Sequence, residues 1–385
     1  MYSKPGHWKD APIVDKDTPY QPNPWMCNGP RLSEYLQEMY ANTFAHYDTF
    51  TLGELPNTPS LEKILQYTSR QAKQLDSTIL FDLMNLDHGG RWPLMPKTWK
   101  LSSLKSITEF AQQQADPKHN GHALTFLENH DQARCVSRYA SDAPEYRVAS
   151  AKLLATYLLT LSGSIVIYEG QEIGSESFWY TRRRRDRHSR LSAVINAPKD
   201  WDIKEYIDVN TINMWREVQE EVARTGDKSL LETATRGIQL SARDHSRTPM
   251  HWDDSTSAGF STSSKTWYRV MESYKEGINV AAQEGDPSSP LNFYRRMMAL
   301  RKEHADVFIR GLFKLYDPEN ESTMIYSKTS LDGKRSAVVA LNFTDKEQSV
   351  ALPSELQEGS LIVDTASGSS DGKLAPYGAR VYISA

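Results

Sequence analysis

The sequence is poor in cysteine, with only Cys27 and Cys135 among its 385 residues. Two thiols cannot build a disulfide framework or a cysteine-rich zinc site, so we expect reduced thiols in a cytoplasmic protein. Long apolar runs are also lacking: the longest uncharged stretch, 153–168, has 16 residues, fewer than the ~20 of a membrane-spanning helix. The first residues, MYSKPGHWKD, contain no apolar segment typical of a signal peptide. These features predict no membrane association.

A basic surplus is missing as well, since 45 Lys and Arg stand against 49 Asp and Glu. The chain as a whole is therefore not suited to bind nucleic acid. The hydrophobic fraction of 39% indicates a globular protein with a large core rather than a disordered chain. Its length predicts two or three domains, at roughly 150 residues each. No spacing of His, Cys and Asp resembles a metal site, and we expect neither metal nor cofactor.

Helix-like and strand-like segments alternate between residues 31 and 174. The expected strands are 50–55, 78–86, 122–131 and 164–174, and the helices between them are 60–68, 103–115 and 142–161, the last opened by a capping box at Asp142–Glu145. Strands separated by helices predict parallel βαβ units. The strands are apolar with little alternation, as expected when both faces are buried.

The rest of the chain divides into two further parts. Residues 175–286 are polar and are expected to form a loop-rich insertion with only short helical patches such as 212–225, followed by an amphipathic helix at 290–305. After residue 306 the pattern changes to short β runs separated by turns, which predicts a small antiparallel sandwich. We therefore expect an α/β domain at 1–306 and an all-β sandwich domain at 307–385.

Two carboxylates lie at the ends of predicted strands. Glu54 ends the first strand, and Asp131 ends the third, in the segment LENHDQAR. In a β/α barrel, catalytic groups converge at the carboxyl ends of the strands. Glycoside hydrolysis needs an acid for the leaving oxygen and anionic groups beside a cationic transition state. Each residue alone is more often a cap or a solvated loop residue.

Four motifs in order strengthen this interpretation: GE at 53–54, ENHD at 128–131, GQEIG at 170–174 and RDHSRTPMHW at 243–252. With them the sequence resembles the α-amylase superfamily, glycoside hydrolase family 13, in its α-glucosidase and oligo-1,6-glucosidase branch of fungal type. The resemblance covers nearly the whole chain. It implies the C-terminal half of a (β/α)8 TIM barrel, around strands five to eight, followed by the sandwich domain.

The resemblance also implies roles for single residues. Glu54 matches the general acid/base, and Asp131 matches the carboxylate that stabilises the transition state. His130, Asn129 and Arg247 match groups that bind the sugar nearest the cleaved bond. The residues expected to contact the next sugar are Leu55, Pro56 and Asn57, and those expected to have a mainly structural role are Tyr168, Glu169, Gln171 and Glu172.

Neighbouring residues raise two questions of geometry. In an ideal strand His130 and Asp131 would point to opposite faces, so both reach a sugar only if the strand has ended before them. Asp82 falls inside the predicted strand 78–86 and is expected to be a hydrogen-bonded interior carboxylate. His88, which follows Asp87, is expected in a loop.

The sequence departs from the family pattern in two places. The family's nucleophilic aspartate lies in a G-F-R-x-D motif shortly before an LYSK-like segment, but here MYSK is the start of the chain. We therefore expect the first half of the barrel and the nucleophile to be missing from these residues. The second departure is Ser175–Val194, which contains six arginines between positions 182 and 190. We interpret it as a solvated or spurious insertion, such as translated intron, rather than a nucleic-acid site.

These observations predict a retaining α-glucosidase that acts on short α-glucosides such as maltose, isomaltose or sucrose. Because the nucleophile is expected to be missing, we expect this chain alone to be inactive. Its partner would be a small oligosaccharide, and we expect a monomer. Two alternatives stay open: a non-catalytic carbohydrate-binding or scaffold protein of the family, and a sucrose-isomerising or transglycosylating relative.

Overall fold

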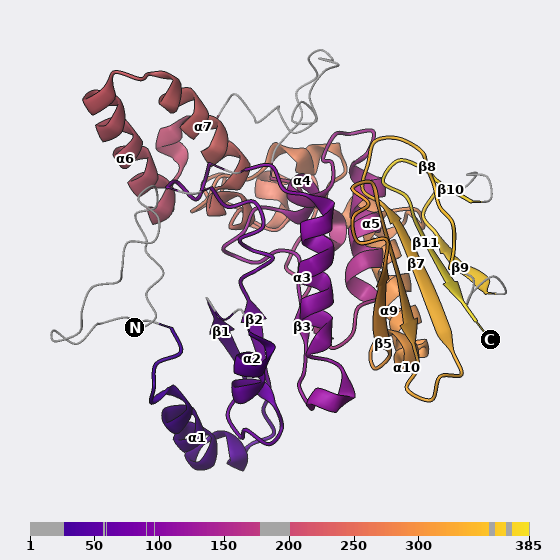
Figure 1. The fold of residues 1–385 in the computed structure, drawn as a ribbon. Coiled ribbons are helices and arrows are strands. Elements are labelled where there is room, and N and C mark those ends of the chain that lie inside the picture. The colour runs from indigo at the N-terminus through magenta and orange to yellow at the C-terminus, as the bar shows by residue number, and fades with distance from the viewer. Residues whose placement is uncertain are drawn as a thin grey trace.

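The computed structural model describes residues 27–56, 58, 60–89, 91–95, 97–177, 201–353, 359–366 and 372–384. Its first part contains two pairs of parallel strands (Figure 1). Strand β1 (Leu52–Leu55) pairs with β2 (Ser77–Leu80), and β3 (Leu124–Thr125) pairs with β4 (Ser164–Ile165). Because β2 also contacts β3, the four strands lie in chain order. The predicted parallel βα arrangement is present.

The helices of this part follow the predicted alternation. They are α1 (Leu32–Asn42), α2 (Leu61–Thr68), α3 (Leu101–Gln113), α4 (Cys135–Tyr139), α5 (Arg147–Leu159), α8 (Val280–Glu284), α9 (Pro290–Glu303) and α10 (Ala305–Phe308). Ser60 caps α2 by accepting a hydrogen bond from the Lys63 amide. Ser289 caps α9 in the same way, with Pro290 in the first turn. No helix among the described residues is long and apolar enough to cross a membrane.

The strands are shorter than the sequence predicts, because local turns take over the backbone hydrogen bonds. The strand expected at 78–86 ends at Leu80, and the Asn85 amide then bonds to the Phe81 carbonyl. Asp82 is consequently an exposed turn residue, so its prediction as an interior strand carboxylate is wrong. The strand expected at 164–174 ends at Ile165, and a 3-10 turn forms at Gln171–Ile173.

The start of α5 is also corrected. The capping box predicted at Asp142–Glu145 does not form, and the helix begins at Arg147. The amides of Tyr146 and Arg147 both donate to the Ala143 carbonyl, at 2.8 Å each, so a tight turn precedes the helix.

The predicted loop-rich insertion contains two substantial helices. Helix α6 (Val209–Thr225) and helix α7 (Ser229–Ser241) form a hairpin that extends away from the strands at the upper left of Figure 1. Gly226, at φ 78°, allows the left-handed turn that ends α6. Their facing side chains form a separate apolar cluster that includes Met214, Val218, Ala234 and Ile238. The insertion is therefore more helical than its polar composition indicates.

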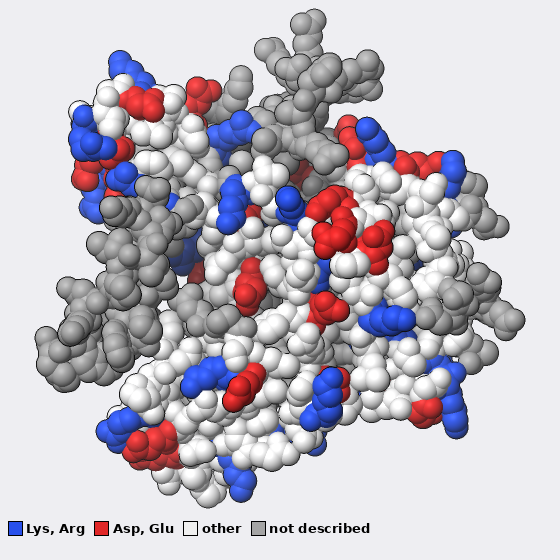
Figure 2. Space-filling view, viewed as in Figure 1, with Lys and Arg blue, Asp and Glu red and all other residues white. Residues whose placement is uncertain are grey.

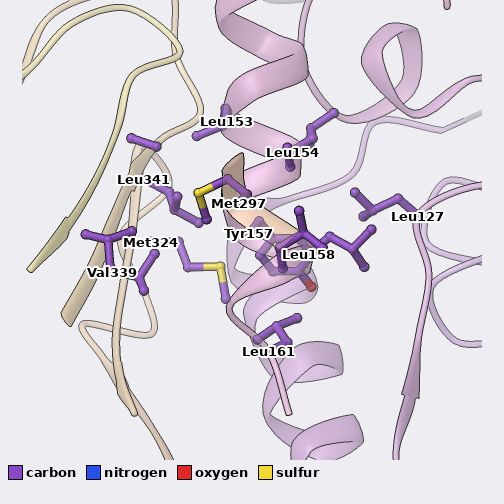
Figure 3. Close-up of a cluster of buried hydrophobic side chains, with 14 of the residues drawn as sticks. Leu127, Leu153, Leu154, Tyr157, Leu158, Leu161, Met297, Met324, Val339 and Leu341 are labelled. Carbon is purple, nitrogen blue, oxygen red and sulfur yellow. The ribbon is translucent and has the colours of Figure 1, made fainter. Parts of the chain in front are cut away.

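The C-terminal part is a five-stranded antiparallel sheet with a small additional pair. The strands are β5 (Leu312–Tyr316), β6 (Thr323–Thr329), β7 (Ser336–Asn342), β9 (Ser360–Asp364) and β11 (Ala379–Ile383), in the order β5-β6-β7-β11-β9, with β8 (Gln348–Ser349) paired to β10 (Lys373–Leu374). One large core joins this sheet to the helices. Figure 3 shows Leu153 of α5 and Met297 of α9 on the side of the sheet residues Met324, Val339 and Leu341, whereas Leu154 and Leu158 of α5 point the other way, toward Leu127.

Candidate active site

The first predicted catalytic residue, Glu54, lies in β1 with its side chain exposed. The register of the parallel pair places it beside Ile79 of β2. Gly53 precedes it, and a Cβ atom there would come within 2.6 Å of Leu75, so a glycine allows this close packing. Glu54 forms no hydrogen bond or ion pair with the other predicted site residues that the structure describes. Its exposed carboxyl group is therefore accessible to a ligand.

The second predicted residue, Asp131, lies in a turn beyond β3. The strand ends at Thr125, and Asn129 organises the turn by accepting a hydrogen bond from the Asp131 amide at 2.8 Å. The condition set by strand geometry is thus met, because His130 and Asp131 follow the strand rather than belong to it. The His130 Nε2 atom lies 3.6 Å from Asp131 Oδ1, and its side chain is 61% exposed.

Two arginines bind the same oxygen of Asp131. Arg247 Nη2 donates to Asp131 Oδ1 at 2.6 Å, and Arg243 Nη1 donates to it at 2.9 Å. Arg247 Nε also donates to the His130 carbonyl at 2.8 Å, which ties the arginine to the turn. Partial burial alone would raise the pKa of Asp131, but Arg243 above all, with His130 and Arg247, outweighs burial and lowers that pKa. Asp131 is therefore held as a carboxylate.

A second carboxylate, Asp208, completes this group. Arg247 Nη1 donates to Asp208 Oδ2 at 2.7 Å, and Arg243 Nε lies 3.4 Å from Asp208 Oδ1. We call these four residues, Asp131, Asp208, Arg243 and Arg247, the Asp–Arg cluster. The sequence predicted Asp131 and Arg247 but missed Arg243 and Asp208. The RDHSR motif at 243–247 could have indicated Arg243 as a second arginine of the site, since Arg243 begins one short 3-10 turn and Arg247 directly follows that turn.

The residues expected to contact the next sugar are less accessible to a ligand than Glu54, where the structure describes them. Leu55 is buried, in an apolar cluster with Ile64, Tyr67 and Leu80. Its side chain has almost no open surface in this structure, so it acts as a core residue. Pro56 is partly buried, and Asn57 lies outside the described residues. Asn129, besides organising the turn, directs its Nδ2 atom to Met84 Sδ at 3.7 Å.

The GQEIG segment makes internal contacts, as expected of structural residues. Tyr168 donates its hydroxyl hydrogen to the Ser246 carbonyl at 3.0 Å, next to Arg247. Gln171 donates to the Tyr294 hydroxyl at 3.0 Å, and the Glu169 carbonyl accepts from Arg134 at 2.5 Å. Burial raises the pKa of Glu172.

Other candidate groups have structural partners. Asp87 is buried and pairs with Arg138, while His88 is partly buried beside it. Burial lowers the pKa of His88. Within the described ranges, no group of three or more His, Cys, Asp and Glu side chains could hold a metal ion. Basic and acidic side chains are interspersed on the face seen in Figure 2, and most of the Ser175–Val194 segment lies outside the described residues.

The geometry so far defines a parallel β/α protein with a β domain and with carboxylates after its strands. A model of the α-amylase catalytic domain matches residues 1–311, and the chain belongs to this family of glycoside hydrolases, family 13. The chain is 35% identical over 385 residues to an α-glucosidase of Candida albicans, which covers 100% of this chain and 63% of that enzyme. It is 35% identical over 367 residues to an oligo-1,6-glucosidase of Parageobacillus thermoglucosidasius, covering 93% of this chain and 59% of that enzyme.

Solved structures show the same relationship. A variant of isomaltulose synthase from Erwinia rhapontici in complex with sucrose has a TM-score of 0.79 and 29% identity, over 92% of this chain and 59% of that one. The trehalose-6-phosphate hydrolase of Bacillus licheniformis has a TM-score of 0.77 and 29% identity, over 93% and 60%. The chain thus has the α-amylase-family fold, a TIM-type barrel plus a β domain, and spans about three fifths of the length of these relatives.

Proposed function

We propose that this protein takes part in retaining hydrolysis of terminal α-linked glucose in short oligosaccharides such as maltose, isomaltose or sucrose. The observation that carries the proposal is the Asp–Arg cluster, which fixes Asp131 as a carboxylate after β3. Glu54 lies near the end of β1, and β1 and β3 are two strand spacings apart, roughly 10 Å at ~4.8 Å per strand. The C-terminal ends of parallel strands face the same edge of the sheet, as glycoside hydrolysis requires of its acidic groups.

Each residue then has a role. Glu54 protonates the glycosidic oxygen and later activates water, for which its exposed carboxyl group is accessible. Asp131 accepts hydrogen bonds from sugar hydroxyls and stabilises positive charge on the sugar ring in the transition state. His130, Asn129 and Arg247 line the same subsite, the first as an exposed donor and the other two by fixing the turn and the carboxylate. Pro56 and Asn57 follow Glu54 and would border the next sugar.

The domain arrangement supports this proposal. We assign the four parallel strands β1 to β4 to strands five to eight of a (β/α)8 barrel, within a catalytic part at 1–306. Residues 307–385 then form the β domain, and the shared core of α5, α9 and the sheet holds the two together. We further propose a cytoplasmic monomer, in which Cys27 and Cys135 are reduced thiols rather than a disulfide.

Retaining hydrolysis also needs a nucleophile about 5–5.5 Å from the acid. No G-F-R-x-D segment occurs in the 385 residues. We do not assign this part to Asp131, because the role that it matches places it against the sugar hydroxyls rather than in line with the anomeric carbon. We therefore assign the acid/base and sugar-holding groups to this chain, and expect the 385 residues alone to bind glucosides without hydrolysing them.

The experiment has two arms. Maltose titrated into the 385-residue chain should give a calorimetric binding signal that Asp131→Asn removes, with no glucose released above a Glu54→Gln control. For turnover, the chain is fused to the remaining barrel segment of an α-glucosidase relative. In this fusion Glu54→Gln should slow maltose hydrolysis by about 10²–10⁴-fold, because natural leaving groups need protonation. The glycosylation step with an activated aryl glucoside should slow much less. Equal loss on both substrates would contradict the acid role of Glu54.

The similarity to isomaltulose synthase supports a second candidate, isomerisation of sucrose. Chromatography of the products that the fusion forms from sucrose separates the two: a hydrolase gives glucose and fructose, whereas an isomerase gives a new disaccharide. The non-catalytic alternative predicts sugar binding in the fusion without turnover of any glucoside.

A further inference from the structure

Asp208 lies on the α6–α7 hairpin and reaches the candidate site from outside the barrel strands. Its side chain is 3% exposed and its carboxylate oxygens meet Arg247 at 2.7 Å and Arg243 at 3.4 Å. Both arginines in turn bind Asp131, on a different part of the fold. Acidic and basic groups therefore alternate around a closed ring: Asp131, Arg243, Asp208 and Arg247.

Asp208 is itself held rigidly. It is the N-cap residue of α6, and its Oδ1 accepts a hydrogen bond from the Asn210 amide at 2.9 Å. Its own amide donates to Asp244 Oδ1 at 3.1 Å, and the fully buried Asp244 also accepts from the Ile207 amide at 2.8 Å. The Thr211 hydroxyl lies 3.4 Å from the other oxygen of Asp244. The backbone around Asp208 is thus anchored before any contact with an arginine is counted.

This anchoring determines where the two guanidinium groups lie. An arginine presents a planar fork of donors, so fixing one edge of the fork on a carboxylate sets the direction of its other edge. In Arg247 the Nη1 atom donates to Asp208, and this contact directs Nη2 to Asp131 Oδ1. Arg243 approaches the same Oδ1 from Nη1. All the arginine hydrogen bonds to Asp131 that the structure describes use Oδ1, which leaves Oδ2 for a ligand.

We propose that Asp208 is a positioning residue for Asp131: it orients Arg243 and Arg247 so that both bind one oxygen, and it thereby makes the other oxygen available to a sugar hydroxyl. The connection to sugar binding rests on the function proposed above, whereas the orientation of the arginines does not. Without the Asp208 charge, the two arginines lose their second carboxylate and become free to leave the site or to cover both oxygens of Asp131.

The capping role of Asp208 can be separated from its charge. Asparagine is as good an N-cap as aspartate, so Asp208→Asn keeps the hydrogen bond to the Asn210 amide while it removes the negative charge. Asp202→Asn is the matched control, since Asp202 caps the neighbouring turn Ile203–Glu205 in the same manner, is exposed, and is not part of the Asp–Arg cluster. Asp208→Ser provides a second neutral cap in case the first variant folds poorly.

The first readout is the chemical reactivity of the arginines, measured by phenylglyoxal labelling and peptide mass spectrometry on the 385-residue chain. Labelling of Arg243 and Arg247 should be several-fold faster in Asp208→Asn and Asp208→Ser than in the wild type, and unchanged in Asp202→Asn. Circular dichroism and the thermal midpoint should stay close to those of the wild type. Labelling rates equal to the wild type in both Asp208 variants would overturn the proposal.

The second readout is the dissociation constant for maltose. We expect Asp208→Asn to weaken binding by about 10-fold or more, the usual effect of losing a charge-assisted contact, while Asp208→Glu recovers part of it. If the Asp208 variants are labelled faster but the wild type itself does not bind maltose, the proposed function is refuted and the positioning role of Asp208 stands. Faster labelling with unchanged maltose affinity would refute the coupling between Asp208 and the sugar site.

Discussion

We expect the stability of the wild-type chain to rise between pH 7 and pH 9, and we expect the replacement of Lys328 with methionine to remove this rise. Lys328 lies on β6 and is fully buried between the sheet and the helices. Its ammonium group donates to the Ser162 hydroxyl, to the Gly311 carbonyl at 2.7 Å and to Gln112 Oε1 at 3.4 Å, all of which are neutral. Burial, with a smaller contribution from the charge of Arg301, lowers its pKa from 10.5 to about 7.

The sign of the effect follows from proton binding. Between pH 7 and 10.5 the unfolded chain keeps the Lys328 proton, whereas the folded chain has released it. Stability therefore rises with pH in this window, because the unfolded state binds more protons. The slope approaches 1.4 kcal/mol per pH unit, and the gain from pH 7 to pH 9 is about 2 kcal/mol, since the folded group is still half protonated at pH 7. Below pH 6 both states are protonated and this contribution is constant.

The assay is urea unfolding of the wild type and Lys328→Met from pH 6 to pH 9.5, with refolding checked at each pH. Thermal midpoints should show the same trend, with a difference of about 2–3 °C for a chain of this size. Lys334→Met, at an exposed turn position, is the control for loss of a lysine. The readout is the slope rather than the absolute stability, because methionine removes one of the two side-chain donors to the Gly311 carbonyl, the other being the Ser162 hydroxyl. Parallel pH curves for the wild type and Lys328→Met would refute the argument.

Two further predictions concern the core. Leu158→Ala removes a fully buried side chain from the cluster in Figure 3 and should lower the free energy of unfolding by about 2–5 kcal/mol, measured in urea at fixed pH. Glu128→Gln breaks a buried pair, since Glu128 is fully buried and binds Arg134 at 3.0 Å and the Cys135 amide. It should cost about 3–5 kcal/mol, whereas Glu34→Gln in an exposed pair with Arg31 should change little; equal effects would contradict the importance of burial.

Much of the fold could be predicted because its determinants are local. The alternation of helices and strands follows from hydrophobic periodicity, and α2, α3 and α9 lie within about two residues of the predicted ranges. Catalytic candidates were predictable for a different reason: Glu54 and Asp131 occur in short motifs whose order is specific to a family. The family relationship confirms that interpretation, while the roles of the single residues stay predictions.

Strand lengths, helix α7 and the full length of α6 were not predictable from local patterns. An apolar segment such as 78–86 has the composition of a strand, but the strand ends at Leu80 and the residues after it form hydrogen-bonded turns. Helix α6 was predicted only in part, as the short helical patch 212–225. Only Thr211, Met214 and Val218 are buried along its 17 residues, so its apolar stripe is narrow and indicates a short helix rather than half of a packed hairpin. Packing against α7, which the sequence does not show, makes it a stable helix.

The Asp–Arg cluster shows the same limit at the site itself. Asp131 and Arg247 are 116 residues apart, and Arg247 and Asp208 are 39 apart, so no local spacing connects them. Asp208 begins α6, and α7 leads directly into the turn that carries both arginines. Three of the four charged groups therefore come from one helical hairpin and the segment after it, and the turn beyond β3 contributes only Asp131. The lowered pKa of the proposed sugar-holding carboxylate, Asp131, is thus a property of two parts of the chain brought together, because the arginines that lower it come from the segment after the hairpin.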